Sequence, residues 1–276
     1  MASDEARCPV CASDEQRTIH AGIKLCVRCR IAFNTGFEPK NYGDTYFLEE
    51  YRRQYSVTYM DDFSGIYRLS KRRLEVILHL LGKKRDISSL TLLDIGSAAG
   101  FFLRCALDHG IGSVNGIEIS QYACRLSKKM CGIPVNNSSF ENASIDCQYD
   151  IITAWYFIEH CNDPVSVMKR IHVALRDNGL FAFSMPSIFG PLFLFRRNEW
   201  IATHPGDHRI DISPRGIRKM LDKCGFRTVF MRAAGVHPER MISPFSPIYR
   251  PFAYLYKLFA RMTSFSDTIE IFAIKR

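Results

Sequence analysis

The sequence predicts a doubly wound α/β fold, in which helices cover both faces of a mostly parallel sheet. The first observation is the stretch 91–103, where a short apolar strand passes through a turn of small residues and continues with helical spacing. A second apolar run ends at Glu118, and the uninterrupted run 149–155 fits a central strand that is buried on both faces. Strands that alternate with helices in this way form the right-handed crossovers of a parallel sheet.

The other elements follow from start and stop signals. Asp163 and Pro164 begin a helix that the turn 177–179 ends, and Ser213 caps a last helix that Gly225 stops. The remaining expected helices are 66–81 and 121–130, and the remaining expected strands are 133–135, 180–185, 226–231 and 268–274. Because the final run alternates between apolar and polar residues, we expect that strand to run antiparallel at the edge of the sheet.

The turn between the first two strands has the features of a nucleoside pocket. Gly96 lets the chain turn where a side chain would block it, and Gly100 lets the helix and a ligand approach closely. Glu118 follows Asp94 by 24 positions, at a strand end where a carboxylate can accept two hydrogen bonds from a ribose diol. The dinucleotide fingerprint G-x-G-x-x-G fails, because its second glycine is Ala98. A βαβ unit without a ligand is the alternative.

Composition narrows the class of protein. With 276 residues, 47% of them hydrophobic, the chain can form one large domain and a small appendage. The formal net charge of +9 favours anionic partners, such as nucleic acid, a membrane face or a phosphorylated substrate. Residues 1–7 are polar and carry no secretory signal, and the uncharged run 179–195 is too interrupted to span a membrane. We therefore expect a cytoplasmic protein, with peripheral membrane contact as an open alternative.

Two C-x-x-C pairs near the amino terminus predict a metal site. Cys8, Cys11, Cys26 and Cys29 supply four thiolates, with fourteen residues between the pairs. Four thiolates complete the tetrahedral shell of Zn²⁺ and leave no open position, so the ion would be structural. Since the segment has few apolar residues, the ion would also supply its folding energy. The alternative is free or redox-active thiols.

Residues 41–85 are expected to form a helical cap. Tyr51, Tyr55 and Tyr59 recur every four residues and give one helical face an aromatic stripe, and the helix 66–81 follows. Most of these aromatic residues are expected to pack on the sheet, and Tyr59 is the candidate for contact with a bound substrate. The basic clusters 71–73 and 83–85 lack interleaved aromatic residues, so we interpret them as solvated helix faces.

Several landmarks occur in the order that is typical of one enzyme family. They are Asp-x-Gly-x-x-x-Gly at 94–100, Glu118, the strand at 150 that ends in Ile-Glu-His, the turn 177–179 and Cys-Gly-Phe at 224–226. The chain resembles the class I S-adenosylmethionine (SAM)-dependent methyltransferases. Within them it is similar to ubiquinone-type O-methyltransferases and sugar C-methyltransferases, some of which carry an amino-terminal zinc module. The resemblance covers about residues 40–235 and the last strand, and it implies a seven-stranded Rossmann-like sheet whose last strand is antiparallel.

The resemblance also implies where SAM would bind. Asp94, Gly96 and Gly100 would surround its methionine and ribose, Glu118 would hold the ribose hydroxyls, and Ile119 would pack on adenine. The backbone at 139–140 would read the adenine edge. The full set of expected cofactor residues is Asp94, Gly96, Ser97, Gly100, Glu118, Ile119, Ser139, Phe140 and Trp155. Members of the family often have glycine where this chain has Ala98, which narrows the turn without excluding the ligand.

Catalysis on a hydroxyl or a carbon acid also needs a base, because SAM supplies only an activated methyl group. His160 follows the strand 149–155 at the carboxyl edge of the sheet, where ligands of α/β folds bind, and Glu159 could orient it. The alternative is a histidine that only hydrogen-bonds to backbone. The loop 200–209 lies where this superfamily builds acceptor pockets, and His204, Asp207 and His208 are its candidates for substrate binding or catalysis.

Two structural alternatives apply to the carboxyl-terminal half. The loop 200–209 could simply cap the sheet, and a second metal is not expected there because the sequence offers no fourth ligand nearby. In the segment 244–262, three prolines precede an apolar stripe that is flanked by Arg250, Lys257 and Arg261. Such a helix could pack as a lid or a dimer contact, or it could lie on an anionic membrane, in which case the acceptor would be lipid-linked.

Together these features predict three parts and one main function. A zinc-ribbon-like module would occupy 1–40, a helical cap 41–85, and a methyltransferase domain 86–276 with a lid or amphipathic insertion at 236–266. The expected reaction is SAM-dependent methylation of oxygen or carbon in a small-molecule, sugar or lipid-linked glycan acceptor. The alternatives are an RNA methyltransferase that uses the zinc module and the basic surface, and a scaffold that keeps the fold without catalysis.

Overall fold

The structure is a computed structural model that describes residues 7–40, 56, 58–82 and 85–276. The predicted aromatic stripe at Tyr51 and Tyr55 and the basic positions 83–84 lie outside these residues. The chain divides into two compact units, and each is described by itself. Unit 1 comprises Met1–Pro39, Tyr156–Lys169 and Phe183–Ala273, and unit 2 comprises Lys40–Trp155, Arg170–Ala182 and Ile274–Arg276.

Seven strands form the main sheet, in the order β10-β11-β8-β7-β4-β5-β6. Their bounds are β4 Thr91–Ile95, β5 Ser113–Glu118, β6 Asn136–Asn137, β7 Tyr149–Trp155, β8 Leu175–Pro186, β10 Phe226–Ala233 and β11 Thr268–Lys275. Strand β4 pairs in parallel with both β5 and β7, and β5 pairs in parallel with β6. The last strands are antiparallel, so the predicted seven-stranded Rossmann-like sheet is confirmed.

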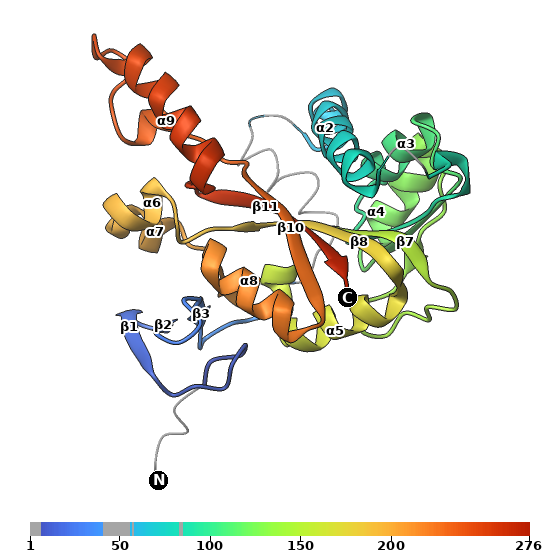
Figure 1. The fold of residues 1–276 in the computed structure, drawn as a ribbon, viewed down its shortest axis with the longest axis horizontal. Helices are drawn as coiled ribbons and strands as arrows, with labels where there is room; N and C mark the ends of the chain where they lie inside the picture. Colours follow the sequence, from blue (N-terminus) through green and yellow to red (C-terminus); the bar gives the residue numbers. More distant parts are fainter. Residues whose placement is uncertain (1–6, 41–55, 57, 83–84) are drawn as a thin grey trace. The chain divides into compact units, whose positions relative to one another are not determined.

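Unit 2 contains the predicted strand-turn-helix unit around β4. Helix α2 (Phe63–Leu81) lies beside α3 (Phe101–Asp108) (Figure 1). The rings of Phe63 and Phe101 meet edge to face, with centroids 4.9 Å apart. Strand β5 contains Gly116 because a Cβ there would lie 2.7 Å from Ser97 Oγ and 2.8 Å from a methyl group of Leu103. The turn after β4 is therefore packed directly on β5.

The helix after β5 is shorter than expected. Helix α4 is Gln121–Leu126, and its N-cap Ser120 accepts a hydrogen bond from the Ala123 N–H group. A π-helical turn, η3 (Ser127–Cys131), replaces the rest of the predicted helix. Ser127 Oγ donates to the carbonyl of Ile133, a local bond that competes with regular helix geometry.

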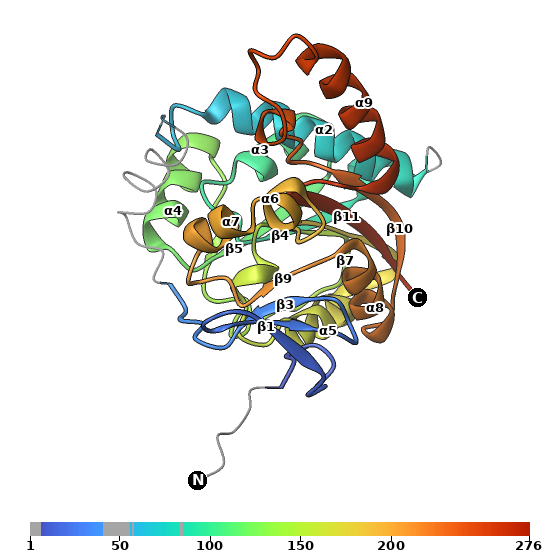
Figure 2. The same cartoon turned by 90° about the vertical axis from the view of Figure 1, so that its left-hand side faces the viewer.

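Unit 1 contains a second, four-stranded sheet in the order β1-β2-β3-β9 (Figure 2). The amino-terminal strands are β1 Gln16–His20, β2 Ile23–Cys26 and β3 Ala32–Asn34, whereas β9 is Ile210–Asp211. Ile23 and Ala32 pack with Ile188, Phe193 and Trp200 in one apolar cluster. The amino-terminal module therefore shares both a sheet and a core with the segment 188–211.

The other elements of unit 1 follow β7 and β8. In the described part of the chain, unit 1 has the 3-10 turns η4 Ile158–His160 and η5 Pro238–Arg240, and unit 2 has η2 Ile87–Ser89. Helix α5 (Pro164–Ala174) begins in unit 1 and ends in unit 2. The other helices of unit 1 are α6 Pro191–Phe195, α7 Arg197–Thr203, α8 Pro214–Lys223 and α9 Tyr249–Thr263. Ser213 Oγ caps α8 by accepting from the Gly216 N–H group at 3.0 Å, and Gly225 follows with φ +85°, as the sequence predicted.

Three predictions about individual elements were wrong: where one helix ends, where the third strand lies, and which strand is at the edge of the sheet. Helix α5 ends at Ala174 and β8 begins at Leu175, so the turn expected at 177–179 lies inside the strand, where Asn178 adopts φ +59°. The third parallel strand is β6 at 136–137 and not 133–135. The terminal strand β11 lies between β8 and β10, so the edge of the sheet is β10.

Helix α9 occupies most of the segment that was predicted to be amphipathic. Its buried residues are Ala253, Tyr256 and Ala260, whereas Leu255 and Phe259 of the predicted apolar stripe are exposed. Among the described residues, no helix combines the length and the apolar character that a bilayer crossing requires.

Candidate functional site

The turn after β4 encloses a buried carboxylate. Asp94 is 2% exposed, and its Oδ1 atom accepts a hydrogen bond from Thr153 Oγ1 on β7 at 2.6 Å. The N–H groups of Gly96 and Ser97 donate to the carbonyl of Ile117 at 2.8 and 3.1 Å. These bonds fold the turn back over the end of β5.

The same turn passes through three left-handed residues. The φ angles are +68° at Gly96, +48° at Ala98 and +75° at Gly100. Glycine adopts this conformation readily, but a Cβ atom makes it costly at Ala98. A side chain on Gly100 would also collide with Ser127 Oγ. The turn therefore needs glycine at both of its ends and tolerates alanine in the middle.

Glu118, at the end of β5, points at this turn. Its Oε2 atom accepts from the Ala98 N–H group at 2.9 Å, and its Oε1 atom accepts from the Ser120 N–H group at 2.8 Å. Each carboxylate oxygen has a second lone pair, so the group can still accept hydrogen bonds from a ligand diol. Burial raises the pKa of Glu118, and the bonds from Ser120 and Ala98 offset part of that effect.

Burial also raises the pKa of Asp94, to about 7. The hydrogen bond from Thr153 and the positive charge of Arg73 favour the ionised form, whereas the nearby Glu118 opposes it. Two acidic groups therefore lie close together in a largely desolvated place. Such a site gains when a ligand brings hydrogen-bond donors or positive charge.

Two polar atoms beside these carboxylates are buried without a hydrogen-bond partner. They are Ser97 Oγ and the indole Nε1 of Trp155. The ring of Trp155 lies between the Arg73 guanidinium, 4.0 Å from its centroid, and the ring of Phe102, 5.4 Å away. Buried polar atoms normally have partners, and here a ligand would supply them. The donors and carboxylates together fit the ribose and the ammonium group of SAM.

The other expected cofactor residues have distinct surroundings. Ile119 is 59% exposed, which leaves an apolar face beside Glu118 for a base to pack on. The amide of Asn137 donates to the carbonyls of Glu118 and Ile119 at 3.1 and 2.9 Å. The carbonyl of Ser139 accepts from the N–H groups of Asn142 and Ala143, and Phe140 is buried with the Arg170 guanidinium 5.3 Å from its ring.

Tyr59, the expected substrate contact in unit 2, packs on the first turn of α3. Its ring is stacked on Phe101, with centroids 5.2 Å apart and an interplanar angle of 13°. Phe101 directly follows Gly100, so Tyr59 lies over the helix that leaves the cofactor turn. The structure places the tyrosine beside that turn, and substrate contact stays a prediction.

A cluster of histidines and carboxylates lies in unit 1. His160, in η4, places Nδ1 at 2.9 Å from the carbonyl oxygen of Asp207 and at 3.3 Å from its Oδ2 atom. Its ring meets that of His208 edge to face, with centroids 4.9 Å apart. A ligand-type atom of Glu159 lies within 4.8 Å of one on His160 and one on His208. The predicted catalytic pair and the predicted substrate histidines are therefore neighbours.

Asp211 of β9 is the central acid of this cluster. Its Oδ2 atom lies 2.6 Å from His204 Nε2, and its Oδ1 atom lies 3.6 Å from His208 Nδ1. Burial acts to raise the pKa of Asp211, but the contacts with His204 and His208 outweigh it and lower the pKa to about 2. Burial likewise acts to lower the pKa of His208, and the acids around it, above all Asp211, raise it overall.

Hydrogen bonds join the amino-terminal module to the loop that carries this cluster, at the point where β3 pairs with β9. The N–H group of Asn34 donates to the carbonyl of Arg209 at 3.0 Å, and Arg209 Nη1 donates to the carbonyl of Asn34 at 2.6 Å. The Asn34 amide also donates to the carbonyl of Gly206, and the Arg209 N–H group donates to the carbonyl of Glu159. These bonds fix the loop that carries His204, Asp207 and His208.

The four predicted metal ligands come together in the same unit. The Sγ atoms of Cys8 and Cys29 lie 3.4 Å apart, those of Cys11 and Cys29 lie 3.4 Å apart, and those of Cys11 and Cys26 lie 3.6 Å apart. Tetrahedral Zn²⁺ with bonds of about 2.3 Å requires sulfur atoms about 3.8 Å apart. The four thiols therefore fit the metal, and they are free of disulfides in the described chain.

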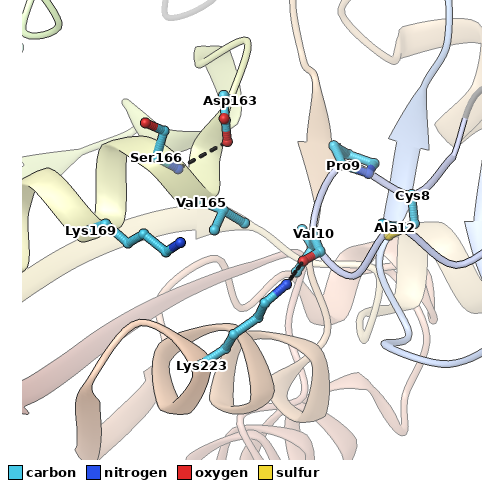
Figure 3. Close-up of a pocket in the computed structure, with 9 residues that line it drawn as sticks. All are labelled: Cys8, Pro9, Val10, Ala12, Asp163, Val165, Ser166, Lys169 and Lys223. Carbon is cyan, nitrogen blue, oxygen red and sulfur yellow. Dashed lines mark hydrogen bonds between the residues drawn. The ribbon is translucent and has the colours of Figure 1, made fainter.

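A shallow pocket of about 300 Å³ lies beside this cysteine module (Figure 3). Lys223 of α8 donates from Nζ to the carbonyl of Val10 at 2.9 Å, and the Asp163 carboxylate caps α5 by accepting from the Ser166 N–H group. The pocket is lined by Cys8, Pro9, Val10, Ala12, Asp163, Val165, Ser166, Lys169 and Lys223. Cys8 is the one predicted site residue among them, so we assign this pocket to the packing of the module on α5 and α8.

Three functional neighbours were missing from the sequence analysis. Thr153 bonds to Asp94, Arg73 lies over Trp155, and Asp211 joins His204 to His208. The spacing His204-x-x-x-His208-x-x-Asp211 was a signal that could have identified Asp211. Nothing local marked Thr153, because its partner lies on another strand. The prediction that the cluster 71–73 forms a solvated helix face was wrong for Arg73, which is 5% exposed with its guanidinium over the Trp155 ring.

Comparisons with known proteins give this geometry a family. A family model described as a methyltransferase domain matches residues 66–229, more than half of the chain. The ubiquinone biosynthesis O-methyltransferase of Bordetella avium (strain 197N) is 24% identical over 209 residues, which cover 71% of this chain and 80% of the relative. The enzyme of the same name from Nitrosomonas europaea is 24% identical over 130 residues, 45% of this chain and 54% of that relative.

Solved structures share the fold. A SAM-dependent methyltransferase from Archaeoglobus fulgidus has a TM-score of 0.54 and 17% identity, over 84% of this chain and all of the other. The plantazolicin methyltransferase BpumL in complex with SAH also has a TM-score of 0.54, with 16% identity over 84% of this chain and 93% of the other. With a family match over most of the sheet that carries Asp94 and Glu118, the chain belongs to the methyltransferase domain family and is a SAM-dependent methyltransferase.

Proposed function

We propose that this enzyme transfers the methyl group of SAM to a hydroxyl oxygen of a small-molecule acceptor. The observation that carries the proposal is the match to ubiquinone biosynthesis O-methyltransferases, together with two buried carboxylates and two unpartnered donors around one turn. A carbon acid or a sugar is the second acceptor class, because the same base chemistry serves both. A small-molecule acceptor needs no extended basic surface on the enzyme, and we therefore prefer it to RNA.

The cofactor residues would divide the ligand between them. Glu118 would accept from the ribose hydroxyls through its remaining lone pairs, and Ile119 would pack on adenine. Asp94, held by Thr153, would face the ammonium group, while Ser97 Oγ and Trp155 Nε1 would gain hydrogen-bond partners. The bound sulfonium supplies an activated methyl group, and the protein has to align the acceptor with it.

The base would be His160. His160 follows Trp155, the last residue of β7, by five positions in the sequence. The Asp207 carbonyl accepts from Nδ1–H, which makes Nε2 the basic nitrogen that would take the acceptor proton. The sequence analysis predicted that Glu159 orients the His160 ring. Because His160 Nδ1 contacts Asp207, our proposal gives that role to Asp207. His204 and His208 would contact the acceptor.

Binding of SAH tests the cofactor assignment. Isothermal titration is expected to give one site in the wild-type chain, and Glu118→Gln is expected to weaken it by roughly 10- to 100-fold, the worth of hydrogen bonds to a charged group. Glu141→Gln, an exposed glutamate of the same unit, is the matched control and should bind normally. A wild-type chain that binds no SAH would instead be the catalytically silent scaffold.

Labelled methyl transfer tests the acceptor. Tritiated-methyl SAM should label phenolic, catecholic or sugar hydroxyls, and His160→Asn should lower kcat by about 10²-fold or more while leaving SAH affinity unchanged. His237→Asn, an exposed histidine paired with Glu239, is the control. Label that enters only RNA, with a steep dependence on salt, would contradict the small-molecule assignment.

We also infer that the four cysteines bind one structural Zn²⁺. The support is the fit of their sulfur spacings to a tetrahedral shell and the hydrogen bonds that tie the module to β9 and α8. Metal analysis should find one zinc per chain, and Cys26→Ser should lose it together with stability. Retention of the zinc in Cys26→Ser would contradict the four-thiolate site.

A further inference from the structure

Helix α9 of unit 1 is apolar on its exposed side. The helix, orange-red in Figure 1, packs against β10 and η5 and buries Ala253, Tyr256 and Ala260. The side of a surface helix that points away from its contacts is normally polar. With about 100° of turn per residue, the exposed apolar residues of α9 are centred roughly 160° from the buried ones. They are Tyr254, Leu255, Leu258, Phe259 and Met262.

The loop before α9 adds a protruding aromatic ring to this side. Phe245 is 98% exposed. Its position is set by a hydrogen-bonded turn, because the Ser246 N–H group donates to the carbonyl of Ser243 at 2.9 Å and the Tyr249 N–H group donates to the carbonyl of Ser246 at 3.0 Å. Prolines at 244 and 247 restrict the backbone on both sides of the ring. We call Phe245 and the five exposed apolar residues of α9 the α9 surface.

Basic residues border the α9 surface along one flank of the helix. Arg250, Lys257 and Arg261 are seven and four positions apart, which places them within roughly 40° of one another, between the buried side and the apolar side. All three are exposed. From residue 240 to residue 266 the sequence has four basic residues and no acidic one. An exposed apolar face beside a positive flank is typical of helices that lie in the interface of an anionic bilayer.

We propose that the α9 surface binds the face of an anionic phospholipid bilayer, with α9 parallel to the membrane plane and Phe245 inserted among the lipid headgroups. The 15 residues of α9 are fewer than the roughly 20 that a spanning helix needs, so the contact is with one leaflet. The match to the methyltransferase family ends at residue 229, before α9 begins. The α9 surface is therefore a feature of this chain that the matched region does not include.

A second copy of the chain fits the α9 surface less well. A two-fold symmetric contact brings the same surface of each copy together. The flank of Arg250, Lys257 and Arg261 then lies against its own positive charge, and like charges brought together in an interface are unfavourable. Phospholipid headgroups supply the negative charge that this flank attracts. A fluid bilayer also admits a protruding ring such as Phe245 without a preformed pocket.

Vesicle flotation of the full chain tests the charge side of the proposal. It needs neither SAM nor an acceptor, so its failure is distinguishable from failure of the proposed methyl transfer. We expect wild type to float with vesicles of phosphatidylcholine and phosphatidylglycerol, and not with phosphatidylcholine alone. The triple variant Arg250→Gln, Lys257→Gln, Arg261→Gln should bind roughly 100-fold more weakly, since each cation near an anionic surface contributes about fivefold.

A matched charge variant controls for the change in net charge. Arg125, Lys128 and Lys129 are three exposed basic residues of unit 2. Their joint replacement by glutamine removes the same number of charges and should leave flotation as in wild type.

The apolar side is tested at Phe245. Phe245→Ser should weaken flotation by roughly 10-fold, because the ring no longer leaves water for the bilayer. Val173→Ser, at an apolar residue of unit 2 that is 70% exposed, is the matched control and should float as wild type does. In Phe245→Trp, lipids with brominated acyl chains should quench the new indole on binding, as expected for a side chain at the boundary of headgroups and acyl chains.

Four results would overturn the proposal. They are wild type that does not float, equal binding to neutral and anionic vesicles, unchanged flotation in the triple variant, and unchanged flotation in Phe245→Ser. A vesicle-free dimer in light scattering that Phe245→Ser converts to monomer would also overturn it and would assign the α9 surface to a second copy of the chain.

Discussion

Asp94 offers a quantitative test of how strongly this site is desolvated. Burial raises the pKa of its carboxyl from 3.8 to about 7 in the folded chain. One pH unit of difference between folded and unfolded pKa values corresponds to about 1.4 kcal/mol, so the full difference is worth about 4 kcal/mol. Because the group is fully buried, solvent screening does not reduce this figure much.

The sign of the effect follows from the raised pKa. The folded chain holds the Asp94 proton more tightly than the unfolded chain, so this contribution to stability is complete below about pH 4 and is lost as pH rises to about 7. Asp94→Asn removes the titration and keeps an oxygen that can accept from Thr153 Oγ1. The stability of the variant relative to wild type should therefore rise by about 4 kcal/mol between about pH 4 and about pH 7.

Urea unfolding of the SAH-free chain at several pH values measures this difference. Because both proteins share every other titrating group, those groups cancel in the comparison. Asp146→Asn, on the exposed surface of the same unit, is the control and should follow wild type at every pH. A difference between Asp94→Asn and wild type that stays flat with pH would show that Asp94 is ionised and well solvated in the folded chain.

Four other substitutions have expected outcomes. Ala98→Gly should raise the free energy of unfolding by up to about 1 kcal/mol in urea, because it relieves a left-handed alanine at φ +48°. Asp211 has its pKa lowered from 3.8 to about 2, so its contribution of about 2 kcal/mol is present above about pH 4 and lost as pH falls; Asp211→Asn should remove that acid dependence in pH-resolved unfolding. Phe245 is 98% exposed, so Phe245→Ser should leave the melting temperature unchanged. Tyr256 is 5% exposed, so Tyr256→Ala should lower the free energy of unfolding by about 3 kcal/mol. Flotation with anionic vesicles shows whether Phe245→Ser also weakens membrane binding.

The geometry of the turn between Asp94 and Glu118 was largely predictable from sequence. The strand, the glycine turn and the second acid are encoded within 28 consecutive residues, so local patterns were enough to bring Asp94 and Glu118 to the same turn. The four cysteines were predictable for the same reason, because the spacing of each pair already matches one face of a metal. Short-range signals of this kind depend little on the rest of the fold.

The histidine cluster was predictable only in part. His160 and His208 could be proposed one by one, but their contact depends on how η4 and the loop before β9 come together, about fifty residues apart. Glu159 was expected to orient His160, whereas the atom that faces Nδ1 belongs to Asp207. The start of β8 was missed because the turn residues at 177–179 tolerate an extended strand once Asn178 adopts a left-handed conformation.

The pairing of β3 with β9 explains why a structural metal module and a site for chemistry would be kept in one unit. A two-residue strand such as β9 has too few hydrogen bonds to persist without a partner, and β3 pairs with both of its residues. Asp211 is one of those residues, and its carboxylate holds His204 and faces His208. Cys26 ends β2 and Cys29 lies three residues before β3, so an ion bound by both thiolates would hold the link between these two strands. Through the pairing of β3 with β9, the amino-terminal module contributes to the position of these histidines, and this contribution requires no contact with nucleic acid.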